Sequence, residues 1–167
     1  MKVKIRKQSK DIPLPEYKTT GSAGFDLVAH SFKGLYAGKK KADLEGVMID
    51  KQKKGFLTLR PHERVLIGTG LYMEIPLGYE LQIRSRSGLA YKHGLTVVNS
   101  PGTIDSDYRG EIGIILINTT SSLIDIQLGE RIAQGVLNEI EQAEWEEVGE
   151  LNSTTRGSGG FGSTGLI

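Results

Sequence analysis

Short runs in which apolar and polar residues alternate recur along this chain, and they constrain its fold more than any other feature. The clearest is LIDIQL at 123–128, and GEIGIILIN at 110–118 starts with the same alternation before it becomes continuously apolar. A period of two places successive side chains on opposite faces of a β-strand, whereas an amphipathic helix requires a period of 3.6. Similar runs are VKIR (3–6), FLTL (56–59), VLIGTGLYMEI (65–75), GYELQIRS (78–85) and LTVVN (95–99). Because Gly, Pro or Asn punctuates these runs, the sequence predicts an all-β chain.

The length of the chain and its many strands together predict the architecture. With 167 residues the chain has about the size of one domain. Many short strands favour a jelly-roll-like or barrel-like sandwich, because stacked or closed sheets hide their edges. RSGLAYKHG at 86–94 has the composition of a short helix, with Ser87 as its cap and Gly94 as its stop. We therefore expect one domain at 1–151 with little other helix.

A lysine-rich segment departs from the strand pattern. Residues 31–54 read SFKGLYAGKKKADLEGVMIDKQKK, in which VMID (47–50) is the one apolar patch. We expect VMID to pair with FLTL across the KQKKG turn, so that the whole segment forms a hairpin or loop inserted at the surface. Charge runs of this kind generally lie in water. The positive charge also allows contact with an acidic partner.

Charge and composition exclude several classes of function. The net charge is +1 and the pI is 7.9, so no basic field covers the chain and we expect no nucleic-acid partner. The absence of cysteine excludes disulfides and thiolate metal sites. The start, MKVKIRKQSK, lacks the apolar stretch of a signal peptide, and no window approaches a membrane span. We expect a cytoplasmic protein without membrane contact.

The last residues, 152–167, are too rich in glycine to contribute to a core. Glycine loses more backbone freedom on ordering than any other residue, so we expect a mobile arm unless a ligand binds it. Arg156 offers a planar fork suited to phosphate, and Phe161 can stack on a base. Stacking contributes about 1 to 3 kcal/mol, while fixing about ten residues costs on the order of 10 to 20 kcal/mol. Closure would therefore require phosphate contacts as well, so the arm is either a frayed tail or a lid that closes on a phosphate-bearing ligand.

Four further stretches contain polar residues that core packing does not require. They are GSAGFDL with Asp26, RSRSGLA with Arg86 and Ser87, VVNSPGTIDSDYRGE with Asn99, Asp105, Asp107 and Tyr108, and GERIAQG with Arg131 and Gln134. Taken singly, each has an ordinary structural interpretation. Asp next to Gly or Ser is typical of turns, and an Arg within a β-protein often forms a structural ion pair.

Taken together with the arm, these stretches resemble, in order and over nearly the whole chain, the five motifs of the trimeric dUTPases. The matching segments are AGFDL, RSGLA, NSPGTIDSDYRG, GERIAQ and RGSGGFGSTG. The resemblance implies a dUTPase-type β-clip fold and hydrolysis of dUTP to dUMP and pyrophosphate. This reaction keeps uracil out of DNA and supplies dUMP for dTMP synthesis. It also implies a homotrimer whose active sites are shared between subunits.

The resemblance also implies which residues act on the substrate. Asp105 would orient and deprotonate the water that attacks the α-phosphorus, and Tyr108 would pack under the deoxyribose and exclude a 2′-hydroxyl. The hairpin at 99–104 would read the uracil edge through Asn99, Gly102, Thr103 and Ile104. Asp107 keeps its interpretation as a turn residue.

On the phosphate side, the resemblance implies that Ser87 bonds the oxygen between the α- and β-phosphorus. The other implied contacts are Arg86, Gly88 and Gln134 on the phosphates and Arg156, Phe161, Gly162, Ser163 and Thr164 on the arm. Asp26 would have a supporting role, and Arg131 is equally suited to a structural ion pair. Mg²⁺ would be held mainly by phosphates and water, so no direct protein ligand is assigned.

Two departures and two rival functions complete the comparison. The segment 31–54 is longer than the usual connection, and Ser85 stands where the family often has Pro, which would slightly loosen that turn. The dCTP deaminases share the fold, but Ile115 occupies the place of their glutamate and cannot shuttle protons. A trimeric protein that binds dUTP without turnover is the other rival. The intact set of predicted site residues argues against it.

Overall fold

The computed structural model describes residues 1–37, 40–42, 47–48, 55–161 and 163. Within these ranges the chain forms fourteen strands and one helix, and every strand pairing is antiparallel. The prediction of an all-β chain is therefore confirmed.

The largest sheet has five strands that are far apart in sequence. Their order across the sheet is β10 (Leu95–Val97), β12 (Gly113–Asn118), β7 (Arg64–Gly68), β3 (Ser31–Ala37) and β4 (Lys40–Ala42). The buried faces of β7 and β12 follow the predicted alternation, since Val65, Ile67, Ile114 and Leu116 are all inaccessible to solvent. This sheet supplies one wall of the core.

A four-stranded sheet carries most of the predicted motifs. Its order is β11 (Gly102–Ile104), β9 (Tyr79–Arg84), β14 (Arg131–Glu139) and β2 (Phe25–Val28). β14 is the longest strand of the described chain, yet it does not alternate regularly because its register with β2 shifts between Arg131 and Ala133. Such a bulge places two residues of one strand opposite one of the other.

Two smaller sheets complete the body. β1 (Lys4–Lys7) pairs with β8 (Leu71–Glu74), and β6 (Phe56–Leu59) lies between β13 (Ile124–Gln127) and β5 (Val47–Met48). Val47 is opposite Leu57 and Met48 is opposite Phe56. The predicted pairing of VMID with FLTL is confirmed for these two residues. The rest of VMID and most of the expected turn, 49–54, lie outside the described residues.

The segment 31–54 is not a surface insertion throughout. Its first part, β3, lies between β7 and β4 in the five-stranded sheet, and Phe32 packs against the core. The sequence concealed this strand because its register with β7 shifts between Phe32 and Gly34, which interrupts the alternation. Deleting 31–54 would therefore remove an interior strand.

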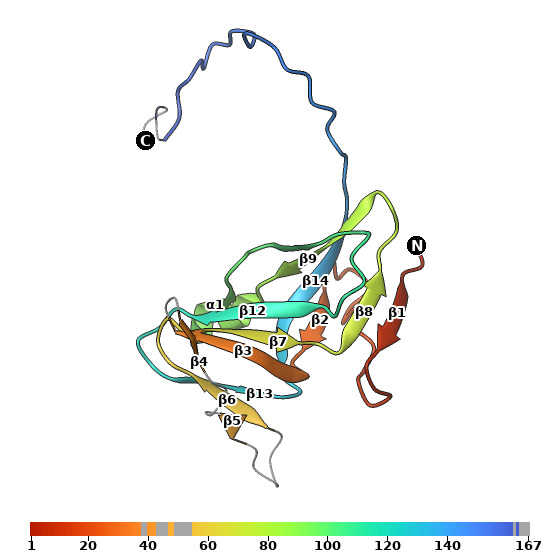
Figure 1. The fold of residues 1–167 in the computed structure, drawn as a ribbon, viewed down its shortest axis with the longest axis vertical. Coiled ribbons are helices and arrows are strands. Elements are labelled where there is room, and N and C mark those ends of the chain that lie inside the picture. Colours follow the sequence, from red (N-terminus) through yellow and green to blue (C-terminus); the bar gives the residue numbers. More distant parts are fainter. Residues whose placement is uncertain (38–39, 43–46, 49–54, 162, 164–167) are drawn as a thin grey trace.

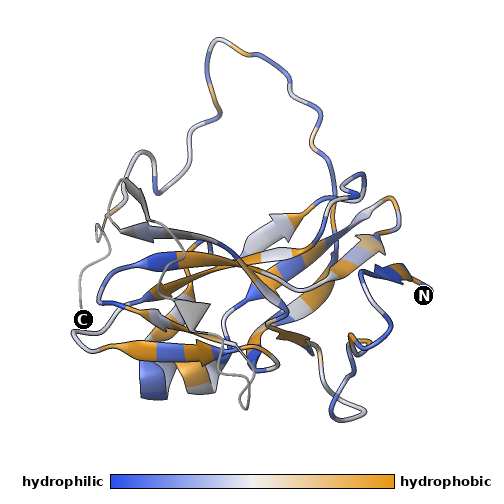
Figure 2. Ribbon diagram, turned by 60° about the horizontal axis from the view of Figure 1, so that its bottom comes forward, coloured by the Kyte–Doolittle hydropathy of each residue, from blue (hydrophilic) through white to orange (hydrophobic). Residues whose placement is uncertain are grey.

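One hydrophobic core joins all four sheets. The fully buried side chains on the strands come from β2, β6, β7, β9, β12, β13 and β14 and include Leu27, Leu57, Leu59, Ile67, Leu81 and Ile126. Figure 2 shows apolar residues concentrated along the strands of the body. Burying a side chain of this size stabilises the fold by about 1.5 to 3 kcal/mol, so the core forms a rigid support for the loops.

The helix α1 (Ser87–His93) follows β9 directly. Gly94 ends it in the left-handed conformation at φ 61°, as predicted. The expectation that Ser87 caps the helix is wrong, because Arg86 occupies the cap position and Ser87 is the first helical residue. No side chain within the described residues caps the helix. Because its hydroxyl has no capping role, Ser87 remains available for a ligand.

The stretch after β14 leaves the body. Ile140 N–H donates to the Gly78 carbonyl at 2.9 Å, and beyond it the chain arcs away (Figure 1). Trp145 and Leu151 are 91% and 88% exposed, so the body of the same chain does not cover them. In the described ranges, no helix is both long enough and apolar enough to span a membrane.

Candidate active site

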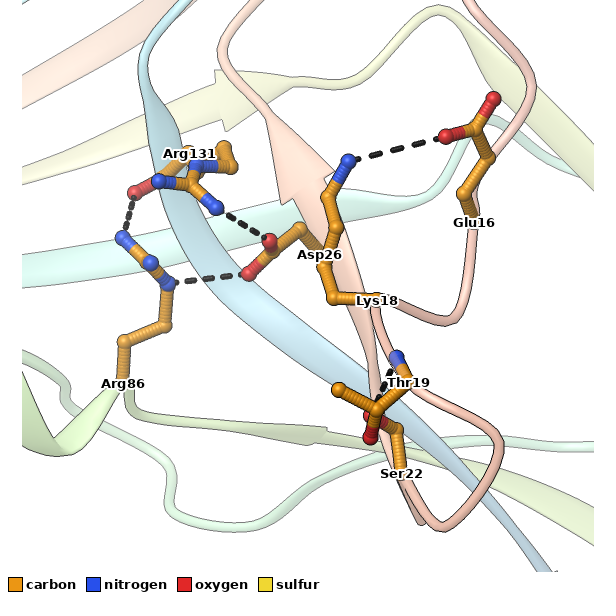
Figure 3. Close-up of polar contacts among 7 residues, drawn as sticks. All are labelled: Glu16, Lys18, Thr19, Ser22, Asp26, Arg86 and Arg131. Carbon is orange, nitrogen blue, oxygen red and sulfur yellow. Dashed lines mark hydrogen bonds and ion pairs between the residues drawn. The ribbon is translucent and has the colours of Figure 1, made fainter.

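Asp26 on β2 holds two arginines from separate motifs. Its Oδ1 lies 3.0 Å from Arg86 Nε and its Oδ2 lies 3.0 Å from Arg131 Nη1 (Figure 3). Arg86 Nη1 also donates to the Arg131 carbonyl at 2.8 Å. The Asp26 side chain is 16% exposed, so these contacts are partly screened from water. The ion pair to which Arg131 is suited is therefore present, and its partner is Asp26, which also holds Arg86.

The geometry leaves Arg86 with free capacity. A guanidinium has five N–H donors, and only two of its nitrogens face Asp26 and Arg131. The remaining donors of this half-buried side chain have no partner among the described residues, so the geometry leaves them able to bind an anion. The anchoring contacts fix the plane of the guanidinium and thereby prepare it for a bidentate contact with phosphate.

Gln134 on β14 lies next to this cluster. Its Nε2 donates to the Ser85 carbonyl at 2.9 Å, and its second amide hydrogen remains free for another acceptor. Gly24 explains how β2 approaches so closely, because a Cβ there would lie 2.7 Å from Gln134 Oε1. Close packing against Gln134 therefore explains why this position of the first motif is a glycine.

The expectation that Ser85, in place of Pro, loosens the turn before Arg86 is wrong. Instead of loosening the turn, its Oγ accepts a hydrogen bond from Val97 N–H at 3.0 Å and lies 2.6 Å from Thr96 Oγ1. These partners are eleven and twelve residues away, so no local sequence signal reveals them. The alternation of LTVVN places a strand here but does not place it beside Ser85.

The third motif forms a hairpin and a turn. Gly102 begins β11 against Asn99, since a Cβ on Gly102 would lie 3.0 Å from Asn99 Nδ2. Asp105 follows β11, is exposed, and its carbonyl accepts from Tyr108 N–H at 3.2 Å. Asp107 lies in the turn between them, as predicted. The Asp105 carboxylate is thus carried by an ordered turn and open to solvent.

The ring of Tyr108 is folded back over Gly110. Tyr108 Oη donates to the Glu111 carbonyl at 3.0 Å, and a Cβ on Gly110 would collide with the Tyr108 hydroxyl. Tyr108 remains 44% exposed, so one face of its ring is open. The sequence did not identify Gly110 as a determinant of this position, because the contact depends on how the turn closes.

Within one chain, the predicted residues form separate groups. Ile104 is opposite Leu81 near the start of β9, so Asp105 lies toward that end. Arg86 and Ser87 follow Arg84 at the other end of β9. The three steps from Leu81 to Arg84 span about 10 Å of strand. Asp105 and Arg86 of one chain therefore lie toward opposite ends of β9.

The arm residues form a further group. Arg156 Nε donates to the Gly159 carbonyl at 3.0 Å, and Ser163 N–H donates to the Gly160 carbonyl at 3.0 Å. The Phe161 ring is fully exposed. Gly162 and Thr164, which were also predicted to bind substrate, lie outside the described residues.

Comparisons with known proteins agree with one another. A family model described as dUTPase matches residues 53–165. A deoxyuridine 5'-triphosphate nucleotidohydrolase of Nautilia profundicola is 52% identical over 99% of each chain. Another of the same name, from Fusobacterium nucleatum, is 46% identical over 99% of this chain and 97% of its own.

Solved structures give the same result for the fold. The dUTPase of Staphylococcus bacteriophage 80alpha, solved with dUPNHPP, aligns with a TM-score of 0.75 and 27% identity over 99% of both chains. The jelly-roll-like fold predicted from the sequence is thereby confirmed. Because the family model covers more than half of the chain and the relatives match throughout, the chain belongs to the dUTPase family of nucleotidohydrolases.

Proposed function

We propose that this chain hydrolyses dUTP to dUMP and pyrophosphate. The observation that carries the proposal is the 52% identity over 99% of a relative named for this activity. The presence of all five motifs supports it, because it provides a base, phosphate donors and a base-stacking ring.

Asp105 acts as the general base. Its carboxylate accepts a proton from a water molecule while the water oxygen attacks the α-phosphorus. The bond from the α-phosphorus to the bridging oxygen then breaks, and pyrophosphate leaves with the electron pair. The exposure of Asp105 and the turn beneath it support this role, since a base must reach water in a fixed geometry.

The residues that follow β9, together with Gln134 on β14, bind the phosphates of the substrate. Ser87 donates a hydrogen bond to the bridging oxygen, where negative charge develops as pyrophosphate leaves. Arg86, held by Asp26, and the free amide hydrogen of Gln134 bind the phosphate oxygens. Gly88, without a side chain, lets the backbone of the first helical turn approach the phosphates.

The hairpin at 99–104 selects the nucleotide. The Asn99 amide and the backbone of Gly102, Thr103 and Ile104 read the O4 and N3 edge of uracil. Cytosine would leave buried groups unpaired at a cost of about 1 to 3 kcal/mol each. A thymine methyl would overpack the pocket. The Tyr108 ring packs under the deoxyribose and excludes a 2′-hydroxyl.

Gly110→Ala is expected to weaken the rejection of UTP. The added Cβ collides with the Tyr108 hydroxyl, so the ring must leave the position in which Glu111 holds it. The ratio of kcat/KM for dUTP over UTP should fall by roughly 10-fold or more, because about 1.4 kcal/mol of discrimination corresponds to tenfold. Gly21→Ala provides the control for adding a methyl group outside the five motifs, since a Cβ there meets nothing within 4 Å. An unchanged ratio in Gly110→Ala would remove Tyr108 as the sugar filter.

The arm closes over the bound nucleotide. Phe161 stacks on uracil, Arg156 binds the phosphates bidentately, and Ser163, Thr164 and the Gly162 backbone cradle the terminal phosphate. The exposure of Phe161 and the purely local hydrogen bonds of Arg156 support this role, because neither group is committed to the body.

Mg²⁺ accompanies the triphosphate. Among the described residues, no three His, Asp or Glu side chains come together to hold an ion. Mg²⁺ commonly binds substrate phosphates and water rather than a cage of protein ligands, so the proposal does not depend on such a group. When bound, the ion neutralises charge on the phosphate oxygens. Asp26 keeps a supporting role in this proposal through Arg86, whose Nε lies 3.0 Å from Asp26 Oδ1.

We further propose a homotrimer with shared active sites. The separation of Asp105 and Arg86 along β9 supports it, because both must reach the same triphosphate. Hydrolysis then requires Asp105 from one copy and Arg86 with Ser87 from another, and the arm of a third copy covers the site. Cytoplasmic localisation and an acidic partner for 31–54 are also retained as proposals.

A substrate panel tests the proposed function. The purified protein with Mg²⁺ is incubated separately with dUTP, dCTP, dTTP and UTP, and released pyrophosphate is measured. We expect release from dUTP alone at a high rate. Tight binding of dUTP without pyrophosphate release would instead favour the regulatory alternative. Release of ammonia from dCTP would favour deamination instead. Ile115 argues against that activity, because it is an aliphatic residue opposite Leu66 in the sheet and cannot shuttle protons.

A further inference from the structure

We propose that Ser85 is a positioning residue for the phosphate-binding loop, which comprises residues 85–88 and joins the end of β9 to the first two residues of α1. The inference rests on the proposed function, because it assigns this loop a role in dUTP hydrolysis. Ser85 does not contact the substrate and acts through Arg86 and Ser87, which follow it.

Ser85 fastens the loop to both large sheets. Its carbonyl accepts from Gln134 Nε2 at 2.9 Å, on β14 of the four-stranded sheet. Its Oγ accepts from Val97 N–H at 3.0 Å and lies 2.6 Å from Thr96 Oγ1, on β10 of the five-stranded sheet. The loop is therefore held from two directions at the residue before Arg86.

The bond from Val97 pairs an amide that the sheet itself leaves open. β10 is an edge strand, and the next N–H along the chain, that of Val98, donates toward β12 at the Ile115 carbonyl. Because successive N–H groups of a strand point to opposite sides, Val97 N–H points to the free edge. Val97 is 3% exposed, so removing the Ser85 hydroxyl would leave a buried donor without its partner.

The position of this loop bears on the chemical step more than on binding. Asp26 would still hold Arg86 in a Ser85 variant, so ground-state contacts with the phosphates would largely remain. Ser87 has no comparable anchor and must meet the bridging oxygen as charge develops there. A displacement of about 1 Å in a catalytic contact can cost about 100-fold in rate.

Ser85→Ala tests the proposal through kcat and KM for dUTP hydrolysis by the full-length protein with Mg²⁺. We expect kcat to fall by about 10- to 100-fold while KM changes by less than about threefold, since a contact made in the transition state is lost. Ser85→Thr retains the hydroxyl and should recover most of the lost kcat.

Thr69→Val is the matched control. The Thr69 hydroxyl also accepts from a buried backbone N–H, that of Leu71 at 3.2 Å, but it belongs to none of the five motifs. We expect its melting temperature to fall with that of Ser85→Ala while its kcat stays close to that of the unmodified protein. An equal loss of kcat in Thr69→Val would mean that general destabilisation causes the effect, which overturns the proposal.

The remaining outcomes also decide the question. Wild-type kcat in Ser85→Ala overturns the proposal, whereas an unmodified protein that leaves dUTP intact overturns the proposed function instead. In that case amide hydrogen exchange at Val97 still tests the fastening, and equally slow exchange in both proteins refutes it. If Ser85→Ala does not fold, Thr96→Val removes only the 2.6 Å hydroxyl contact and should lower kcat severalfold. An unchanged kcat there counts against the proposal.

Discussion

Asp105→Asn is expected to lower kcat for dUTP by about 10²- to 10⁴-fold, the contribution typical of a positioned general base. The amide has the size of the carboxylate but cannot accept the proton of the attacking water. The turn should survive, because it is the backbone carbonyl of Asp105 that accepts from Tyr108 N–H at 3.2 Å. Nucleotide binding should therefore remain, and calorimetric titration with a non-hydrolysable dUTP analogue would measure it.

Asp107→Asn is the control for this experiment. Asp107 lies two residues away in the same turn, is equally exposed and has no assigned chemical role. Its substitution removes the same charge from the same loop, so it separates loss of the base from a change in local electrostatics. We expect nearly full turnover. Full turnover in Asp105→Asn, or equal losses in both variants, would exclude Asp105 as the base.

The strands that could be predicted are those whose side chains alternate without interruption. β12 and β6 lie within the predicted runs because each has a regular buried face. β14 and β3 could not be recognised in the same way, because a shift in register breaks the period of two in each. The order of the strands was also beyond the sequence, since β12 lies between β10 and β7 through contacts between distant segments.

The candidate site likewise has parts that the sequence predicts and parts that it does not. The chemical types of the site residues are visible in the sequence, so Asp26, Arg86 and Gln134 could be selected before their contacts were known. What holds them depends on tertiary approach. The sequence offered no reason to join Asp26 to Arg131 across 105 residues, or Ser85 to a strand twelve residues further on. Positioning residues are therefore harder to predict than the groups they position.

Truncation after Thr155, which removes Arg156 and all that follows, should abolish dUTP hydrolysis without unfolding the body. The described residues of the removed segment contribute no buried side chain, and their hydrogen bonds are all local. The melting temperature should therefore stay close to that of the full chain. Activity should be lost because closure supplies both the stacking ring and the guanidinium fork, while the open site leaves the triphosphate in water.

Two point variants divide this effect between base and phosphates. Phe161→Ala removes stacking worth about 1 to 3 kcal/mol, so kcat/KM should fall by about 5- to 150-fold. Arg156→Lys keeps the positive charge but loses the planar fork, so a bidentate contact predicts a substantial loss despite the conserved charge. A truncated enzyme with full activity would refute the lid. Full activity in Arg156→Lys alone would show that charge, rather than the geometry of the fork, draws the arm onto the triphosphate.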